Sequence, residues 1–438
     1  MSELKNELVK KLENKSAKLG VVGLGYVGLP LAVEKAKAGY NVMGFDVQDT
    51  KVEMVNNGHN YIGDIVDSEL KDLVRLGKLR ATTDFSFVKD VDAVSICVPT
   101  PLDLYKQPDI SYVVASTRSI SKYLHRGMLI VLESTTYPGT TEEVCKPILE
   151  ESGLKCGKDF FLAFSPERVD PGNKEFKTKN TPKVVGGCTS ECTEVAAMLY
   201  RSVLQSEVYT VSSPAVAEME KILENTFRNI NIALANEMAI LCKKMGIDVW
   251  EVIDAAKTKP YGFMAFYPGP GIGGHCIPLD PFYLAWKARE FDYRTRLIDI
   301  SGEINDFMPE FVVDNIMRLL NNENKPLRES TVLLLGISYK NDIDDMRESP
   351  ALKVIDNLER NGANIIVNDP FIPRFTHAGK EYVSVSWENK IDTADIVVIT
   401  TNHSSYDYEK IVEKASILYD TRNATKDVVK NRNKINKL

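Results

Sequence analysis

The chain has 438 residues, of which 44% are hydrophobic and 26% are charged, and its formal net charge is −7. This composition suits a folded protein of two or three domains, and it excludes a chain that is disordered, collagen-like or a coiled coil throughout. The small negative charge provides no general attraction to nucleic acid or to an anionic membrane surface, so we expect neither as a partner.

Three features of the sequence bear on its cellular location. The first residues, MSELKNELVKKLENKSAK, are too polar for a secretory signal. No apolar run approaches the roughly 20 residues needed to cross a bilayer. There are seven cysteines and no CxxC motif, so we expect no disulfide framework and predict a cytoplasmic location. Cys188 and Cys192 have no second cysteine pair to match them, so we predict no metal site.

The chain opens with a charged segment, residues 1–16, in which Leu4, Leu8 and Leu12 form a thin apolar stripe. This pattern predicts a helical extension that lies against a partner or against the body of the protein. Between residues 17 and 212, short apolar runs such as LGVV and VDAVSICV alternate with helical stretches. That alternation predicts a Rossmann-like domain with a parallel, doubly wound sheet.

Residues 213–322 have the spacing of helices rather than strands. An apolar repeat of helical period begins at Pro214 and predicts a long central helix. A second helical pattern covers about 297–320, and Pro309 is expected to kink or break it. After a polar linker the strand–helix alternation returns over 323–438. The predicted fold class is therefore α/β, with two Rossmann-like doubly wound parallel-sheet domains joined by a long central helix and a helical middle domain.

A dinucleotide-binding fingerprint follows the first predicted strand. Gly23 permits a tight turn, Gly25 lets the backbone approach a pyrophosphate closely, and Gly28 lets the next helix pack closely. The helix N-terminus offers free N–H groups to phosphate. Asp46, about 20 residues further on, can accept hydrogen bonds from ribose hydroxyls and would repel a 2′-phosphate, which favours NAD over NADP. A glycine-rich turn with an ordinary exposed Asp is the alternative.

A second chemical signal is Cys276, which stands in the sequence GIGGHCIPLD behind further glycines and prolines. Glycines let backbone and ligand approach the sulfur closely. Asp280, four residues on, could orient a water or accept a proton. This context suits a nucleophilic thiolate, and a cysteine held in a structural turn is the alternative.

Several motifs of the chain are those of a known family: GLGYVGLP, VPTP at 98–101, EST at 133–135, SPER at 165–168, AEMEKILEN at 217–225, GGHCIPLD at 273–280, and GISYKND and RESPA within 336–351. From about residue 18 to about residue 423, the chain resembles the UDP-sugar 6-dehydrogenases. The resemblance implies an NAD-dependent four-electron oxidation of the C6 alcohol of a UDP-sugar to a UDP-uronic acid. The implied intermediates are a cysteine thiohemiacetal and a thioester, because an aldehyde must form a tetrahedral adduct before it can give up a hydride.

The resemblance also implies roles for individual residues. Cys276 would be the nucleophile. Lys221 and Asn225, which lie four residues apart on one predicted helix face, would stabilise the developing oxyanion. The remaining implied catalytic residues would handle protons and water: Asp280, Glu167 and Thr135.

Two sets of binding residues follow from the same resemblance. The cofactor would be bound by Gly23, Gly25, Tyr26, Val27, Gly28, Asp46, Pro99, Thr100, Thr135 and Arg347. The UDP-sugar would be bound by Glu167, Arg168, Lys221, Asn225, Tyr267, Gly273, Tyr339, Lys340 and Arg422. A cation such as Lys340 suits a pyrophosphate.

Three departures from the UDP-glucose branch of the family bear on the sugar. Leu279 stands three residues after Cys276, where that branch has a lysine, and Arg168 follows Glu167. Pro260 lies near the place of an arginine that reaches a neighbouring subunit in that branch. SPER and GGHCIP resemble the UDP-N-acetylhexosamine branch, above all UDP-N-acetylglucosamine 6-dehydrogenase. We therefore expect UDP-N-acetylglucosamine as substrate, with UDP-N-acetylmannosamine, UDP-N-acetylgalactosamine and UDP-glucose as open alternatives.

Two other functions are compatible with parts of the sequence. A single-step β-hydroxyacid dehydrogenase would share the Rossmann and helical domains but would need neither Cys276 nor a second nucleotide domain. A non-catalytic NAD sensor would need no nucleophile. The resemblance further implies a homodimer through the long central helix, or a higher homo-oligomer, and a role in supplying precursors of surface polysaccharides.

Overall fold

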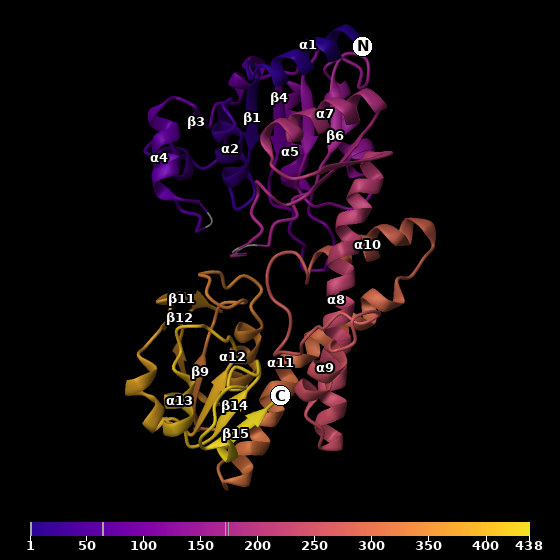
Figure 1. Ribbon diagram of the computed structural model, residues 1–438. Coiled ribbons are helices and arrows are strands. Elements are labelled where there is room, and N and C mark those ends of the chain that lie inside the picture. The colour runs from indigo at the N-terminus through magenta and orange to yellow at the C-terminus, as the bar shows by residue number, and fades with distance from the viewer. Residues whose placement is uncertain (1, 64, 171, 174) are drawn as a thin grey trace. The chain divides into compact units, whose positions relative to one another are not determined.

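The chain path of the protein, in a computed structural model, is shown in Figure 1. The residues that the structure describes are 2–63, 65–170, 172–173 and 175–438. They form two compact units, Met1–Glu224 with Phe282–Tyr293, and Asn225–Pro281 with Arg294–Leu438. Two helices cross the boundary between these units: α8 (Pro214–Met245) and α10 (Asp280–Ala288).

The first unit contains an eight-stranded sheet. Its strands are β1 (Lys18–Val22), β2 (Asn41–Phe45), β3 (Leu79–Thr82), β4 (Ala93–Ile96), β5 (Leu129–Leu132), β6 (Phe161–Phe164), β7 (Lys183–Gly187) and β8 (Val208–Val211). They lie in the order β3-β2-β1-β4-β5-β6-β7-β8, and all neighbours are parallel except β6 and β7. Strands β4, β5 and β6 are buried along their whole length, as expected where helices cover both faces of a sheet.

Most helices of the first unit connect these strands. They are α1 (Ser2–Glu13), α2 (Gly28–Lys37), α3 (Asp49–Asn56), α4 (Asp67–Arg75), α5 (Ser111–Ser121), α6 (Lys146–Glu150) and α7 (Ser190–Val203), with the short turns η1 (Phe85–Asp90), η2 (Thr141–Cys145) and η3 (Arg289–Phe291). Helix α1 is the predicted extension, and its Leu8 and Leu12 are buried in one hydrophobic cluster with Tyr200 of α7. The hydroxyl of Tyr40 donates to the carbonyl of Leu12 at 2.7 Å. The extension therefore lies against the body of the protein.

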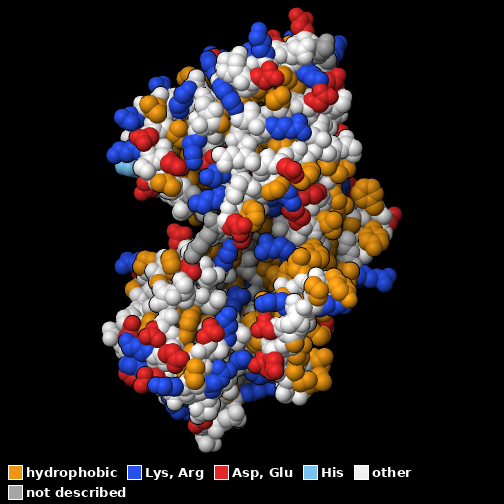
Figure 2. All heavy atoms as spheres, viewed as in Figure 1, with side chains coloured by type: hydrophobic (Ala, Val, Ile, Leu, Met, Phe, Trp, Pro, Cys, Tyr) orange, Lys and Arg blue, Asp and Glu red, His pale blue; other side chains and the backbone are white. Residues whose placement is uncertain are grey.

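The predicted long central helix is α8, which has 32 residues and is followed by α9 (Val249–Lys257). Much of its apolar repeat is not core: Met219, Leu223 and Phe227 are exposed. Figure 2 shows hydrophobic side chains gathered over the part of the surface where Figure 1 places α8 and α9. The helix thus leaves an apolar face open, and apolar patches of this kind mark interaction surfaces.

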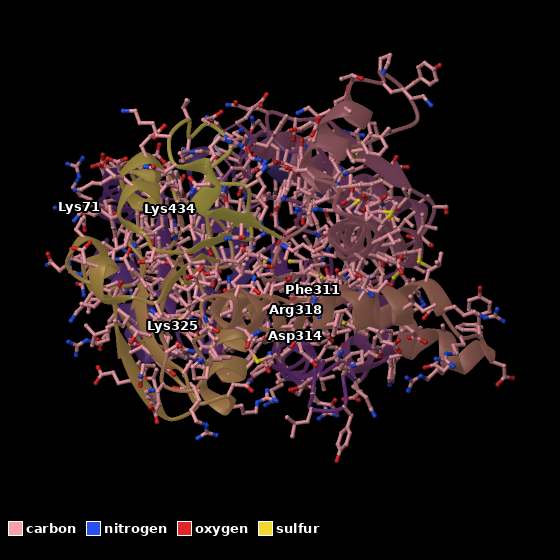
Figure 3. The ribbon with its side chains drawn as sticks, turned by 90° about the horizontal axis from the view of Figure 1, so that it is seen from below. Lys71, Phe311, Asp314, Arg318, Lys325 and Lys434 are labelled. Atoms are coloured by element: carbon pink, nitrogen blue, oxygen red, sulfur yellow. The ribbon has the colours of Figure 1, made fainter. Side chains whose placement is uncertain are left out.

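The second long helical pattern is α11 (Arg296–Asn322). The helix continues through Pro309, so the expected break is absent. Pro309 is buried, and the neighbouring Phe311 packs in the core of the second unit, so tertiary packing offsets the lost backbone hydrogen bond. Figure 3 labels Phe311, Asp314 and Arg318 of this helix, of which Phe311 is buried, Asp314 half-buried and Arg318 exposed.

The second unit contains a five-stranded parallel sheet and a hairpin. The sheet strands are β9 (Thr331–Leu335), β10 (Asn364–Asn368), β13 (Ile396–Ile399), β14 (Leu418–Asp420) and β15 (Ile435–Lys437), and the hairpin strands are β11 (Arg374–His377) and β12 (Lys380–Val383). The remaining elements are α12 (Pro350–Arg360), α13 (Tyr408–Lys414), η4 (Trp387–Asn389), η5 (Ile391–Thr393) and η6 (Arg432–Lys434). The sheet order β10-β9-β13-β14-β15 reverses direction between β9 and β13, which is where doubly wound sheets bind ligands.

Both sheets confirm the predicted α/β class with Rossmann-like halves. The apolar runs LGVV and TVLLLGIS form β1 and β9. The antiparallel strand β7 and the hairpin β11–β12 were not predicted, because short strands without clear alternation give a weak signal. Within the described part of the chain, no helix has both the length and the apolar character needed to cross a membrane.

Candidate active site

The predicted fingerprint loop lies between β1 and α2. Gly23 has a φ of +88°, and a Cβ there would lie 2.5 Å from the carbonyl oxygen of Cys97. A Cβ on Gly28 would lie 1.8 Å from the carbonyl oxygen of Gly23, so only glycine fits at either position. A Cβ on Gly25 would meet none of the described atoms within 4 Å. The open side of Gly25, at the N-terminus of α2, therefore suits a pyrophosphate.

Asp46 directly follows β2 and is buried. Its Oδ2 accepts the N–H of Leu24 at 2.8 Å, and its Oδ1 accepts the N–H of Gln48 at 3.0 Å. The side chain thus ties the end of β2 to the glycine loop. The Lys51 ammonium lies 3.8 Å from Oδ2 and offsets part of the negative charge. A carboxylate in this place fits the ribose hydroxyls of NAD.

The other predicted cofactor residues of the first unit lie at the carboxyl ends of its strands. Thr100, after β4, donates its hydroxyl to the carbonyl of Thr135, after β5, at 2.8 Å. Pro99 and Tyr26 are exposed, and Val27 precedes the first residue of α2. Because parallel strands end at the same edge of a sheet, these residues share the edge that carries the glycine loop.

A buried ion pair lies beneath the predicted catalytic residue Glu167. The Lys183 ammonium lies 2.8 Å from Glu133 Oε2 and 3.5 Å from Glu167 Oε2, and Tyr200 donates to Glu133 Oε1 at 2.7 Å. Burial lowers the pKa of Lys183, but Glu133 and Glu167 outweigh that effect and raise it overall. Glu167 Oε1 also accepts the N–H of Val169 at 3.0 Å. The Glu167 carboxylate is therefore held from both sides.

Arg168, predicted to contact the sugar, is engaged with acidic residues of α8. Its Nε lies 3.3 Å from Glu224 Oε2 and 3.5 Å from Glu220 Oε1, and its Nη1 donates to the carbonyl of Pro182 at 3.0 Å. A second contact joins Nη2 to Glu224. A hydrogen bond from Arg168 to a sugar would have to compete with these bonds.

Helix α8 buries a polar face. Lys221, Asn225, Asn229 and Asn236 are all buried, whereas an ordinary surface helix turns such residues to solvent. Lys221 and Asn225 therefore lie on one helix face, as predicted. Asn229 extends that face by one turn and donates to the carbonyl of Ile277 at 3.0 Å, so the helix also anchors the loop around the candidate nucleophile.

The candidate nucleophile Cys276 is exposed and lies just before α10. Its carbonyl oxygen accepts the N–H groups of Leu279 at 3.1 Å and of Asp280 at 2.9 Å. Asp280 is buried, and its Oδ2 accepts the side-chain amide of Asn225 at 2.6 Å. An exposed thiol and the buried carboxyl of Asp280 therefore stand in one turn, and that carboxyl is bonded to the side-chain amide of Asn225 on α8.

The glycines before Cys276 pack against the segment 336–351. A Cβ on Gly273 would lie 2.5 Å from the Cβ of Tyr339, and one on Gly274 would lie 2.8 Å from the Tyr339 ring. The N–H of Gly274 donates to the carbonyl of Arg347 at 3.1 Å. The Arg347 guanidinium forms a bidentate pair with Asp345, at 3.0 Å and 2.6 Å. The second unit thus brings Gly273, Tyr339 and Arg347 together beside the nucleophile loop.

Arg422 borders the same loop, whereas Tyr267 is bound elsewhere. A Cβ on Gly269 would lie 2.6 Å from Arg422 Nη1, and Arg422 Nε donates to the carbonyl of Thr400 at 3.0 Å. Burial lowers the pKa of Arg422 to about 10, which leaves the guanidinium charged at neutral pH. Tyr267 donates its hydroxyl to Asp254 of α9 at 2.7 Å.

Three segments of the chain match the domains of one protein family. Residues 17–204 match the NAD binding domain, residues 215–307 the central domain and residues 333–427 the UDP binding domain of the UDP-glucose/GDP-mannose dehydrogenase family. The chain belongs to this family. It is therefore an NAD-dependent UDP-sugar dehydrogenase, an oxidoreductase, as the sequence motifs imply.

Relatives of this UDP-sugar dehydrogenase carry several substrate names. A UDP-N-acetyl-D-mannosamine dehydrogenase from Pyrococcus horikoshii is 36% identical over 94% of this chain and 96% of the relative. A UDP-N-acetyl-D-glucosamine 6-dehydrogenase from Pseudomonas aeruginosa is 35% identical over 93% and 97%. The solved structure of the Pyrococcus horikoshii enzyme has a TM-score of 0.86 with this chain at 35% identity, covering 96% of this chain and 98% of the other. None of these similarities supports a non-catalytic NAD sensor.

Several buried polar residues near the candidate sites were not predicted from the sequence, among them Glu133, Lys183, Asn229 and His403. Glu133 and Lys183 did give a signal, since each is a charge at the end of an apolar strand run, and charges in such places are almost never buried unless paired. The burial of Asn229 and His403 depends on packing between segments distant in sequence, which no local pattern reveals.

Proposed function

We propose that this dehydrogenase oxidises the C6 alcohol of a UDP-N-acetylhexosamine, with UDP-N-acetylglucosamine as the preferred substrate, to the UDP-uronic acid. One alcohol, two NAD⁺ and one water give one carboxylate, two NADH and three protons. The observation that carries the proposal is the exposed Cys276 in one turn with the buried Asp280, whose carboxyl is bonded to Asn225 of α8. A single oxidation to the aldehyde would need no such thiol.

The proposed chemistry divides between the thiol and the groups around it. NAD, when bound, supplies the hydride acceptor. After the first hydride leaves, the Cys276 sulfur bonds to the aldehyde carbon, and loss of a second hydride from this adduct leaves a thioester. Water then attacks the thioester carbon, the carbon–sulfur bond breaks, and the thiolate leaves. Lys221 and Asn225 donate to the oxyanion that develops on the substrate.

Proton and water handling falls to three carboxyl and hydroxyl groups. Asp280 fixes the amide of Asn225 through the 2.6 Å bond and accepts a proton from the attacking water. Glu167 and Thr135 position that water. The Lys183 ammonium, 3.5 Å from Glu167 Oε2, helps to hold the Glu167 side chain in place.

The two ligands, NAD and the UDP-sugar, would be held by different sets of residues. For NAD, the proposed residues are Gly23, Gly25, Tyr26, Val27, Gly28, Asp46, Pro99, Thr100, Thr135 and Arg347. For the UDP-sugar, they are Gly273, Tyr339, Lys340 and Arg422 near the nucleophile loop, with Arg168, Glu167, Lys221, Asn225 and Tyr267. Lys340 supplies the cation for the diphosphate.

The preference for an N-acetylhexosamine rests on the surroundings of the nucleophile. Leu279 removes a cation from beside Cys276, and the half-buried Phe266 packs edge-on against Phe227 at 5.7 Å between ring centres. An acetamido group carries a donor, an acceptor and a methyl, which suit such a mixed surface. Buried polar groups that bond the amide would be left unpaired by UDP-glucose, and this discriminates strongly. The names of the relatives include UDP-N-acetylmannosamine as well as UDP-N-acetylglucosamine, so both enter the test.

The proposal includes an assembly and a location. The exposed apolar side chains of α8 run along several turns of one helix, and a two-fold axis would pair this face with itself in a homodimer or a larger homo-oligomer. We also propose a cytoplasmic location, for which the odd number of cysteines speaks, and a role in supplying surface polysaccharide precursors. We divide the chain into an extension (1–16), an NAD domain (17–212), a central domain (213–322) and a UDP domain (323–438).

One experiment tests the reaction and the sugar together. Purified enzyme with NAD is given UDP-N-acetylglucosamine, UDP-N-acetylmannosamine, UDP-N-acetylgalactosamine or UDP-glucose, and NADH and product mass are followed. We expect two NADH per sugar consumed and the highest kcat/KM with UDP-N-acetylglucosamine. The Cys276→Ala variant should form no uronic acid, while Cys242→Ala, a half-buried cysteine elsewhere, serves as control. A ratio of one NADH per sugar, or uronic acid from Cys276→Ala, would contradict the covalent route.

A further inference from the structure

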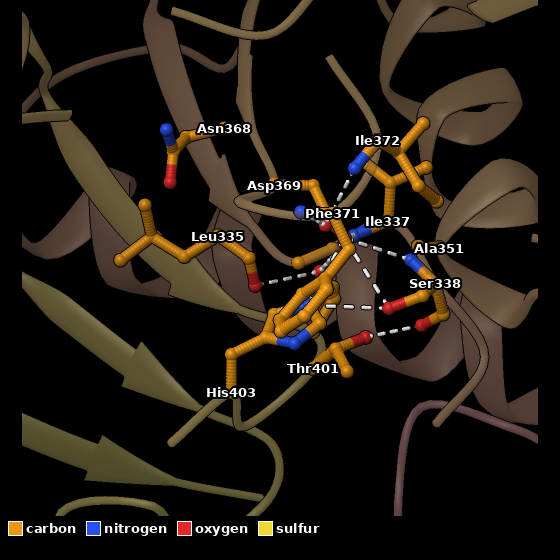
Figure 4. A network of polar contacts seen from close by, with 12 residues as sticks. Leu335, Ile337, Ser338, Ala351, Asn368, Asp369, Phe371, Ile372, Thr401 and His403 are labelled. Carbon is orange, nitrogen blue, oxygen red and sulfur yellow. Dashed lines mark hydrogen bonds and ion pairs between the residues drawn. The ribbon is translucent and has the colours of Figure 1, made fainter. Parts of the chain in front are cut away.

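A buried polar cluster lies at the carboxyl ends of β9, β10 and β13 in the second unit (Figure 4). We call it the Asp369 cluster, and its side chains are those of Ser338, Asp369, Thr401 and His403, all buried. The sheet order reverses between β9 and β13, and ligands of doubly wound sheets bind outside such a point. Residues 333–427 are those that match the UDP binding domain. The cluster therefore lies directly beneath the expected nucleotide site.

Asp369 is the acceptor at the centre of this cluster. Its Oδ2 accepts the N–H groups of Ile337 at 2.6 Å and Ser338 at 2.9 Å, and its Oδ1 accepts those of Phe371 at 2.8 Å and Ile372 at 3.1 Å. Burial raises the pKa of Asp369, but the bonds from His403 and the backbone outweigh this and lower it overall. The ionised carboxylate therefore fixes the start of the segment 337–342.

His403 connects Asp369 to the other end of that segment. Its Nε2 lies 3.0 Å from Asp369 Oδ2 and 3.1 Å from Ser338 Oγ. Its Nδ1 accepts the backbone N–H of Asp342 at 3.0 Å. An Nδ1 that accepts carries no proton, so the imidazole is the neutral tautomer with its proton on Nε2, and Nε2 donates to the carboxylate. One ring thus bonds at both ends of the segment 337–342.

The segment between these two anchors carries the residues expected to contact the nucleotide. Lys340 lies in it, and its carbonyl accepts the hydroxyl of Ser338 at 3.0 Å. Tyr339 also lies in it, and its ring is the surface on which Gly273 and Gly274 of the nucleophile loop pack. A shift of this segment would therefore move both the diphosphate-binding cation and the support of the nucleophile loop.

We propose that His403 is a positioning residue for the UDP-sugar: its neutral imidazole, bonded to Asp369 and to the backbone of Asp342, holds the segment 337–342 in the shape that binds the uridine diphosphate. The inference rests on the proposed function, because it takes UDP as the ligand of this unit. His403 does not touch the reacting atoms. Its loss should weaken binding of the nucleotide and leave the NAD end of the reaction unchanged.

The two bonds of the imidazole can be removed separately. In His403→Asn the amide oxygen takes the place of Nδ1 and keeps the acceptor for Asp342, while the bond to Asp369 is lost. In His403→Gln the amide nitrogen takes the place of Nε2 and keeps the donor to Asp369, while the bond to Asp342 is lost. His377→Asn is the matched control, because His377 forms a partly exposed pair with Asp356 at 2.7 Å in the same unit.

The readouts are the Kd of UDP alone by calorimetry, the KM of each substrate, and the thermal midpoint. We expect the Kd of UDP to rise roughly 10- to 100-fold in His403→Asn, which loses the charge-assisted bond to Asp369, and about 3- to 10-fold in His403→Gln, which loses the neutral bond to Asp342. The KM of the UDP-sugar should rise alongside, whereas the KM of NAD should stay within about twofold. Hydrogen exchange at residues 337–342 should quicken, and His377→Asn should match the wild type in every readout.

The outcomes separate this inference from the proposed function. If wild-type enzyme fails to bind UDP, both are overturned. If wild-type enzyme binds UDP and the folded His403 variants bind it equally tightly, only the inference is overturned, and His403 serves stability alone. Should both His403 variants fail to fold, the wild-type enzyme decides instead, because UDP bound to the segment 337–342 should slow hydrogen exchange there. Exchange at residues 337–342 that UDP leaves unchanged would then overturn the inference.

Discussion

The side-chain amide of Asn225 donates to the carboxylate of Asp280 at 2.6 Å, which joins α8 to the first residue of α10. Each group therefore sets the direction of the other. The amide cannot rotate away from the carboxylate without leaving a buried acceptor unpaired, which costs about 1–3 kcal/mol. Asn225 is thus held with little freedom by Asp280, a residue of the Cys276 turn, as an oxyanion donor must be.

We predict that Asn225→Ala lowers kcat by about 10²–10³, the usual loss for one preorganised donor. The Kd of NAD should change little. Steady-state kinetics and cofactor titration measure both quantities. Asn231→Ala is the control, since Asn231 lies on the same helix and donates to the carbonyl of Phe227 at 2.7 Å. Near-normal turnover in Asn225→Ala would leave the Asn225–Asp280 pair with a structural role alone.

Asp46 should control the choice of cofactor. Asp46→Ala removes the carboxylate that faces a 2′-phosphate, and it also frees the N–H of Leu24. We expect kcat/KM for NAD to fall, and the ratio of kcat/KM for NAD to kcat/KM for NADP to fall by at least about tenfold. Kinetics with the two cofactors measure this ratio. Asp49→Ala, at an exposed position three residues on, should keep the wild-type ratio; an unaltered ratio in Asp46→Ala would refute the assignment.

The buried pair of Lys183 and Glu133 gives a stability prediction. Lys183→Met leaves Glu133 buried with its main cation removed, which typically costs about 3–5 kcal/mol. Chemical unfolding measures the loss, and Lys183→Met with Glu133→Gln should recover part of it. Lys155→Met, which breaks an exposed pair with Glu150, should cost no more than about 1 kcal/mol. Equal losses of unfolding free energy in Lys183→Met and Lys155→Met would show that the buried pair stabilises the protein no more than the exposed pair does.

Glu220 gives a prediction about pH. Burial and the neighbouring Glu224 raise the pKa of Glu220 to about 7, from 4.5 in the unfolded chain. The folded state therefore binds a proton at Glu220 more tightly than the unfolded chain does. The stability that this proton contributes is lost as pH rises from about 4.5 to about 7.

Glu220→Gln, which stays neutral, should escape that loss. The difference in thermal midpoint between Glu220→Gln and wild type should therefore grow in favour of the variant from pH 5 to pH 8. Glu237→Gln, on the exposed side of α8, should show no such trend. A difference that is the same at both pH values would mean that Glu220 titrates as an ordinary carboxyl.

The sequence predicts most of the fold because its signals are local. The glycines of the fingerprint and the strand that precedes them are contiguous, and so are the alternating runs of the second sheet. The sequence predicts less of the candidate active site than of the fold. Lys221 and Asn225 read as solvated helix residues, and only the packing of α8 shows that this polar face is the buried one. The apolar side chains of α8 read as core residues, yet several of them are exposed. The reason is that periodicity tells which residues share a face but not which face is covered.

The contact of Gly273 and Gly274 with Tyr339 constrains how this protein can evolve. A side chain at residue 273 would overlap the Cβ atom of residue 339, and every residue except glycine has a Cβ atom. Residue 273 can therefore change only if one of the two segments moves. At residue 274 the obstacle is the aromatic ring and a φ of +85°. A smaller side chain at 339 would remove only the contact with the ring and not the strain of the positive φ, so among descendants of this sequence both glycines should persist as long as the two segments keep this packing.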